Sequence, residues 1–447
     1  MNKADTIYNS FPSFDGKCIC TFDCREDCFL KVYEDVTEND FKAYLSALEQ
    51  NGFEVLQKNE INGNQFAAIL KNVQVNMLYT PCDSTLRITA SEKDLTPNFK
   101  KTKCKGDCHT TFYAFENDQT IIDCGMCLMV QCPDYSFFLV DSGHYFQMND
   151  NDRIHKFMRE RTPEGQKIVV NGWLITHGHT DHISKLIDFL KYNTDDVIIE
   201  GFYQNIQPTD YGNEEDNHEE KEMADKLLRI LDEYPAPVYK LHTGMRFYIR
   251  NLTFDVLSTH EDLHPDYIED YNDSSCVVMM EAEASKVFIP GDAAVMAGKK
   301  MEERFGETLK CDVVQIAHHG HTGLSTNCYE LLCADTVIFP VTRIFFEADL
   351  DRKEENKKAV ELASNCYVTG DGTVVVPLPY NKETVTALPD ETFEDFEKIK
   401  RIWRYVYSED RKKELYDIFL AHGGNENNLV LPTSPFGWIE PKPPIEE

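Results

Sequence analysis

The stretch IVVNGWLITHGHTDH, residues 168–182, decides the fold. Its first eight residues are mostly apolar, which predicts a buried β-strand ending at Ile175. The next seven residues bring three imidazoles and a carboxylate onto one short loop: His177, His179, Asp181, His182. No packing requirement asks for such a set, whereas neutral imidazole and carboxylate oxygen are ligands for zinc and related divalent ions. The run therefore predicts a metal-binding loop at the end of a strand.

The spacing within this loop predicts two metal positions. Alternation along the loop allows His177 and His179 to face one metal while Asp181 and His182 face a second. The helix expected after the loop carries apolar residues on one face, which anchors the loop to a core.

Three other segments place polar residues next to predicted strands. These are FFLVDSG at 137–143, VFIPGD at 287–292 and DVVQIAHHGHTG at 312–323. Adjacent side chains on a strand point to opposite sides. Only one residue of the pair His318 and His319 is therefore expected to be a direct metal ligand. We predict His318 as the ligand and His319 as a supporting or substrate-facing residue.

THGHTDH following FFLVDSG resembles the metallo-β-lactamase superfamily. The resemblance implies an α/β chain folded as a four-layer αββα sandwich. It also implies that Asp141 braces the metal loop by hydrogen bonding without being a ligand, and that Asp292 is a carboxylate bridging two metals. Within the superfamily, NDSSCVV at 272–278 together with the two downstream motifs resembles the hydrolase domain of ComEC-type competence proteins.

This closer resemblance covers roughly residues 112–380, and it implies Asn272 and Ser275 as substrate-binding residues. No membrane channel accompanies it, so a role in DNA uptake does not carry over. The third metal-binding histidine of β-lactamases has no clean counterpart. His260 and His264 lie in an acidic loop, where exposed residues are favoured over ligands.

The chain divides into three predicted parts. Residues 1–110 form a small α+β domain of unknown role, with a helix capped at Thr37 and several strands after it. Residues 111–385 alternate strands and helices, which is typical of layered α/β architecture, and a last apolar run at 374–377 is expected to close the second sheet. Residues 386–447 form a helical C-terminal extension that ends in a Pro-rich, acidic tail.

The charged residues limit the kinds of partner that the protein is expected to bind. The 447 residues contain 45 Lys plus Arg and 77 Asp plus Glu, which gives a formal net charge of −32. Such a field repels polyanions, so nucleic acid and membranes are disfavoured and a small-molecule substrate is expected. The chain shows neither a signal-like start nor a run of about 18 apolar residues, so a cytoplasmic protein is expected.

The 15 cysteines fit reduced thiols better than a disulfide framework, because their number is odd and the chain is large and acidic. Six of them near the start lack the paired spacing of a thiolate metal site. Free thiols are therefore expected at these positions: Cys18, Cys20, Cys24, Cys28, Cys104, Cys108.

These features predict a dinuclear metal-dependent hydrolase. Two divalent ions, with zinc favoured and manganese or iron as alternatives, would supply a bridging hydroxide, since coordination lowers the pKa of water towards about 7. A small phosphodiester or another activated ester is the expected substrate. Asp181 is expected to relay a proton and His319 to protonate the leaving group. An iron-dependent redox member of the same fold and a nuclease are the alternatives.

Overall fold

The computed structural model describes most of the chain up to residue 388. The described ranges are 3–25, 27–92, 95–117, 125–145, 147, 149–208, 218–266, 268 and 270–388. The predicted C-terminal extension lies outside them except for its first three residues. Within these ranges, every helix is too short or too polar to serve as a membrane span.

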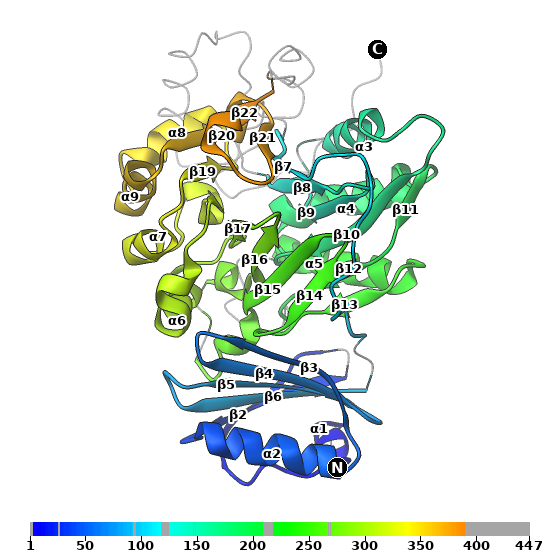
Figure 1. The fold of residues 1–447 in the computed structure, drawn as a ribbon, viewed down its shortest axis with the longest axis vertical. Helices are drawn as coiled ribbons and strands as arrows, with labels where there is room; N and C mark the ends of the chain where they lie inside the picture. Colours follow the sequence, from blue (N-terminus) through cyan, green and yellow to red (C-terminus); the bar gives the residue numbers. More distant parts are fainter. Residues whose placement is uncertain are drawn as a thin grey trace.

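The N-terminal part is a six-stranded antiparallel sheet with two helices on one face (Figure 1). The strands, in spatial order, are β1 (Lys17–Asp23), β2 (Cys28–Glu34), β6 (Thr85–Ser91), β5 (Gln74–Thr80), β4 (Asn64–Leu70) and β3 (Glu54–Ile61). The helices are α1 (Lys3–Tyr8) and α2 (Glu38–Gln50). α2 begins where predicted, because Thr37 and Asp40 cap each other's main-chain N–H groups.

Two larger sheets form the rest of the described fold, here called the sandwich. The first sheet has the order β13 (Val238–Lys240), β12 (Phe202–Gln204), β10 (Ile168–Ile175), β9 (Phe137–Asp141), β8 (Cys127–Gln131), β7 (Thr111–Ala114), β21 (Val374–Pro377) and β22 (Thr386–Ala387), with β11 (Val197–Ile199) beside β10. The second sheet has the order β14 (Arg246–Ile249), β15 (Leu252–Ser258), β16 (Val277–Ala282), β17 (Ser285–Ile289), β18 (Val313–Gln315), β19 (Thr336–Phe339) and β20 (Asn365–Val368).

Helices cover the outer face of each large sheet (Figure 1). The first sheet carries α3 (Asp150–Glu160), α4 (Thr180–Tyr192) and α5 (His218–Glu233); the second carries α6 (Val295–Phe305), α7 (Thr326–Leu332), α8 (Arg343–Leu350) and α9 (Glu354–Leu362). Strand alternation produces these layers. Phe138 and Val140 point into the core between the sheets, whereas Phe137 and Leu139 pack under the helices. The predicted four-layer αββα sandwich of the metallo-β-lactamase fold is confirmed.

One strand lies in a different sheet from the one expected. Residues 374–377 form β21, but the prediction that they close the second sheet was wrong. β21 pairs antiparallel with β7 of the first sheet, with Val374 opposite Ala114 and Pro377 opposite Thr111. An apolar pattern identifies a strand without specifying its partner, because pairing between distant segments depends on the tertiary fold.

The N-terminal sheet packs its helix-free face against the sandwich. Phe66 of β4 belongs to the core between the two large sheets, whereas its neighbour Ala67 packs towards α1 and α2. The Asn59 amide donates to the Gly244 carbonyl at 2.9 Å. Buried contacts therefore cross between the two parts, and the domain boundary near residue 110 stays a prediction.

Candidate metal centre

Four acidic and imidazole side chains converge beside the ends of β10, β17 and β18. Asp181, His182, Asp292 and His319, here called the primary cluster, each offer one ligand atom, and these atoms lie within 4.8 Å of one another. His182 Nε2 lies 3.1 Å from Asp292 Oδ2 and 3.2 Å from His319 Nε2. His319 Nε2 lies 3.1 Å from Asp181 Oδ2. Such nitrogen and oxygen donors suit zinc and related divalent ions.

The predicted metal-binding loop joins β10 to α4. Asp181 and His182 lie in the first turn of α4, which begins at Thr180. Thr180 donates its N–H and its hydroxyl to the Glu220 carboxylate of α5, at 2.5 and 2.9 Å. These bonds fix the start of the helix, whose N-terminal dipole favours a carboxylate at Asp181. Glu220 stood in a uniformly charged stretch, and no sequence signal distinguished it.

Asp141, which the resemblance implies as a brace of the metal-binding loop, lies behind His182. Its Oδ2 is 2.7 Å from His182 Nδ1, and its two oxygens accept hydrogen bonds from the Thr176 N–H at 2.8 Å and the Thr176 hydroxyl at 2.7 Å. The side chain is fully buried. Because Nδ1 of His182 is engaged by Asp141, Nε2 is directed into the primary cluster, an arrangement common among metal-binding histidines.

We expect Asp141→Asn to lower metal affinity by about 10- to 100-fold while the fold is retained, because the amide cannot anchor His182 as the carboxylate does. Competition with a chromophoric chelator measures the change. Asp188→Asn is the control, since Asp188 lies on α4 together with His182 but pairs with Lys185. Equal affinity in both variants would remove Asp141 from the account.

Asp292 is held by its main chain at the end of β17. Its N–H donates to the Ser275 hydroxyl at 3.2 Å. Gly291 has φ +58°, and a Cβ there would lie 2.8 Å from Cβ of Thr176, so glycine permits close approach to the metal-binding loop. Ser275, predicted to bind substrate, is fully buried behind Asp292. Its hydroxyl accepts the Asp292 N–H, so this contact supports the position of Asp292.

The pair His318 and His319 is arranged differently from the prediction. β18 ends at Gln315, and both histidines lie in a kinked turn, Ala317–Gly320, where their φ angles are +49° and +55°. The premise of strand alternation was therefore wrong. His319 lies in the primary cluster, whereas His318 Nε2 is 4.0 Å from Asp292 Oδ2 and 3.4 Å from Asn272 Nδ2. His318 is also the more exposed of the two.

His177 and His179 lie beside the primary cluster. The His177 ring centroid is 4.3 Å from that of His182 and 4.6 Å from that of His179. Two buried atoms, His177 Nε2 and Asp292 Oδ1, have no hydrogen-bond partner among the described residues. Buried polar atoms are normally satisfied. Two buried atoms that can bind a metal and have no hydrogen-bond partner among the described residues, next to the primary cluster, fit a bound cation.

The charges in the primary cluster are strongly coupled. Burial lowers the pKa of His182 and of His319, but Asp292 and Asp181 outweigh this effect and raise both pKa values well above the ordinary range. Burial raises the pKa of Asp292, but His182 and His319 outweigh it and lower that pKa. The buried carboxylates thus require positive charge between them, which protons or a divalent cation can supply.

The buried His144, next to Thr180, predicts that the folded protein loses stability in acid. Burial lowers the pKa of His144 to about 3, against an ordinary value near 6.5. Below about pH 6.5 the unfolded chain binds a proton there that the folded chain does not, so the stability due to neutral His144 is lost as the pH falls towards 3, by up to about 1.4 kcal/mol per pH unit. Denaturant unfolding of metal-free protein should therefore show a shallower loss between pH 6.5 and 4 in His144→Gln. Parallel profiles would contradict this.

Tyr271 is a residue that sequence reasoning missed. Its ring centroid is 5.0 Å from that of His179, and its hydroxyl donates to the Gln207 carbonyl at 3.2 Å. A Cβ at Gly178 would lie 2.9 Å from this hydroxyl, so the glycine leaves room for it. The only sequence signal was its position directly before Asn272. Asn272, predicted to bind substrate, contacts His318, which lies at the border of the primary cluster.

Comparisons with known proteins give distant structural neighbours only. No protein-family model matches the sequence, and a search of curated proteins returns no match. The metallo-beta-lactamase fold protein YhfI from Bacillus subtilis is 11% identical over 58% of this chain and 96% of its own, with a TM-score of 0.35. Yeast PDE1 is 10% identical over 58% of this chain and 98% of its own, also with a TM-score of 0.35.

A third neighbour is CmlA, a diiron β-hydroxylase from Streptomyces venezuelae. It is 14% identical over 60% of this chain and 54% of its own, with a TM-score of 0.35. TM-scores and identities at this level are too low to transfer a reaction from any of these proteins to this chain.

Proposed function

We propose that this chain is a dinuclear metal-dependent hydrolase that acts on a small phosphodiester or another activated ester. The observation that carries the proposal is the primary cluster, in which two carboxylates and two imidazoles face one another; three of the four residues are buried and Asp181 is half-buried. The unsatisfied Asp292 Oδ1 and His177 Nε2 at its border extend the donor set to a second position.

The ligands divide between two positions. We assign His177 and His179 to the first metal, Asp181, His182 and His319 to the second, and Asp292 to both. This assignment exchanges the roles expected for His318 and His319. Bound ions of this kind supply an activated water near neutral pH and polarise the scissile bond. Zinc fits these donors, and manganese and iron fit them as well.

His318 is the group that we assign to the substrate side. Its Nδ1 donates to the Thr322 carbonyl at 2.5 Å, which leaves the lone pair of a neutral ring on Nε2. Burial lowers the pKa of His318, so the neutral form predominates near pH 7. Nε2 accepts a long hydrogen bond from Asn272 Nδ2 at 3.4 Å, which a substrate proton can displace.

The net charge of −32 argues for a small substrate. Affinity for nucleic acid depends on Lys and Arg releasing condensed counterions. Two divalent ions add only about four positive charges at one point, which is enough for one phosphate group and insufficient for a polyanion. The surrounding negative field acts over about 8 Å at physiological salt, so a compact diester avoids most of its repulsion.

The proposal is tested by a hydrolysis panel at fixed metal concentration. The panel contains bis(p-nitrophenyl) phosphate, a thioester, a lactone, and single- and double-stranded DNA. We expect turnover of the small diester or another small ester, and weak binding of DNA at low salt. Tight, salt-sensitive DNA binding with efficient cleavage would establish a nuclease instead. Iron as the only stably bound metal, together with oxygen consumption and no hydrolysis, would establish the redox alternative.

A further inference from the structure

A second group of metal-ligating side chains lies where the N-terminal sheet meets the sandwich. Cys24, His260 and Glu261, here called the second cluster, are buried, and one ligand atom from each lies within 4.8 Å of the other two. Cys24 follows β1, whereas His260 and Glu261 follow β15. The expectation that His260 and His264 are exposed loop residues was wrong, because both are fully buried.

Hydrogen bonding fixes which nitrogen of His260 is available to a ligand. The Asn205 Nδ2 group donates to the Leu241 carbonyl at 2.7 Å and to Glu261 Oε1 at 3.0 Å. Both partners are acceptors, so Asn205 Oδ1 must face His260 Nε2, 3.1 Å away. Nε2 therefore carries the proton, and the lone pair lies on Nδ1. Nδ1 is buried and has no hydrogen-bond partner among the described residues.

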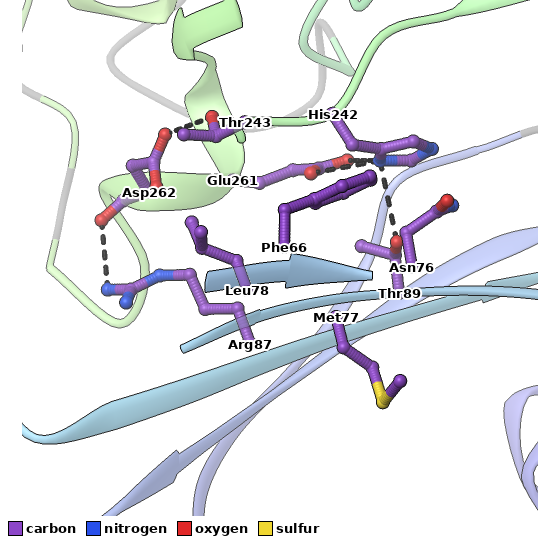
Figure 2. Close-up of a pocket in the computed structure, with 10 residues that line it drawn as sticks. All are labelled: Phe66, Asn76, Met77, Leu78, Arg87, Thr89, His242, Thr243, Glu261 and Asp262. Atoms are coloured by element: carbon purple, nitrogen blue, oxygen red, sulfur yellow. Dashed lines mark hydrogen bonds and ion pairs between the residues drawn. The ribbon is translucent and has the colours of Figure 1, made fainter. Parts of the chain in front are cut away.

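Glu261 is oriented by His242. His242 Nδ1 lies 2.9 Å from its Oε1 and 3.1 Å from its Oε2, and Figure 2 shows this pair above Thr89 of the N-terminal sheet. The carboxylate of the adjacent Asp262 accepts from Arg304 and, as Figure 2 shows, from the Thr243 hydroxyl. The main-chain carbonyl of Asp262 accepts from Arg87. A carboxylate held by a histidine in this way is preorganised as a metal ligand.

The surroundings keep His260 neutral and enclose the second cluster. Burial lowers the pKa of His260 well below its ordinary value, and His264 and Lys240 add to this effect, so the imidazole is neutral. The Lys240 ammonium donates to the Cys24 carbonyl at 2.7 Å and so fixes the main chain that carries this thiol. The Phe22 ring stacks on His264, with centroids 3.8 Å apart, and shields the second cluster.

We propose that Cys24, His260 and Glu261 bind one thiophilic divalent cation, zinc by the chemistry of its ligands, and thereby fasten the N-terminal sheet to the sandwich. Sulfur, nitrogen and oxygen donors in this combination select zinc over magnesium or calcium. On binding, the Cys24 thiol releases its proton to solvent, and the thiolate and the Glu261 carboxylate balance the two charges of the ion. This site is separate from the primary cluster and does not depend on the proposed hydrolysis.

Cobalt substitution tests this site in the full chain. A thiolate bound to Co²⁺ gives an intense charge-transfer absorption, and the ligands assigned to the hydrolase centre contain no sulfur. We expect this band in the wild type and in His319→Ala, but not in Cys24→Ser. His260→Gln and Glu261→Gln should weaken it, and they serve as second variants if Cys24→Ser folds poorly. Cys328→Ser is the matched control, because Cys328 is fully buried in another core, and it should keep the band.

Metal content and thermal unfolding give an independent readout. Cys24→Ser should hold about one zinc ion fewer per chain than the wild type. A chelator should lower the thermal unfolding midpoint of Cys328→Ser by more than that of Cys24→Ser, because a ligand that binds only the folded chain stabilises it. No charge-transfer band in the wild type, or an unchanged band and zinc content in Cys24→Ser, would overturn the proposal.

Discussion

His319→Ala is expected to lose most of the metal bound at the primary cluster, whereas His318→Ala is expected to keep it. His319 Nδ1 donates to the Pro340 carbonyl at 2.7 Å, so Nε2 is the nitrogen directed towards Asp181 and Asp292. The ring is almost completely buried. Loss of a residue that only supports a ligand costs about 10- to 100-fold, and loss of a direct ligand should cost more.

Elemental analysis and hydrolysis of bis(p-nitrophenyl) phosphate measure both variants. We expect His319→Ala to lose hydrolysis by more than about 100-fold together with metal. His318→Ala should keep the metal and lose turnover, because its Nε2 faces the substrate side. The opposite pattern, with metal lost only from His318→Ala, would restore the assignment made from strand alternation.

Asp292→Asn is expected to have an effect of similar size. Asp292 Oδ2 lies 3.1 Å from His182 Nε2 and 3.3 Å from His319 Nε2, and Oδ1 is unsatisfied among the described residues. The amide keeps the shape of the side chain but removes one negative charge and one acceptor oxygen. Both proposed metal positions use this carboxylate, so we expect metal affinity and hydrolysis to fall together by more than about 100-fold.

Asp273→Asn is the matched control for Asp292→Asn. Asp273 is also a buried carboxylate in this region, but it accepts N–H bonds from Ala294 and Ala297 at the start of α6. Its replacement should cost about 1 kcal/mol of stability, as for other N-terminal caps, and leave metal content unchanged. Equal metal loss in the two variants would point to a general disturbance of the fold and against Asp292 as a ligand.

The sequence predicted the core of the fold and, as metal ligands, three of the four residues of the primary cluster. The strand 168–175 and the loop after it are contiguous, so hydrophobic periodicity and ligand chemistry act on neighbouring residues. The same holds for Asp292, which lies close behind the end of β17 at Ile289. Contacts between distant segments were harder to predict, as β21 illustrates by pairing with β7.

The arrangement of His318 and His319 differs from the expectation for a local reason. The prediction assumed an extended backbone, in which neighbours alternate, but both residues adopt a left-handed conformation that is uncommon outside glycine. The turn directs His319 inward and leaves His318 at the border. No residue pattern in this segment predicts that left-handed conformation, and Gly320 alone does not specify it.

The burial of His260 was missed for a tertiary reason. An acidic loop rich in polar residues predicts exposure, but the N-terminal sheet covers this loop and brings Cys24 against it. The spacing of the cysteines alone argued against a metal site, because the other proposed ligands lie more than 200 residues further along the chain. Only the packing of the two parts brings them together.

The most direct test of the proposed hydrolase is to remove the metal and restore it in the Cys24→Ser variant, in which the second cluster no longer contributes. We expect metal-free protein to be inactive towards bis(p-nitrophenyl) phosphate, and activity to return and saturate as about two zinc or manganese ions bind per chain. Full hydrolysis by the metal-free protein, or saturating metal that restores no hydrolysis of this or any other ester in the panel, would contradict the proposal.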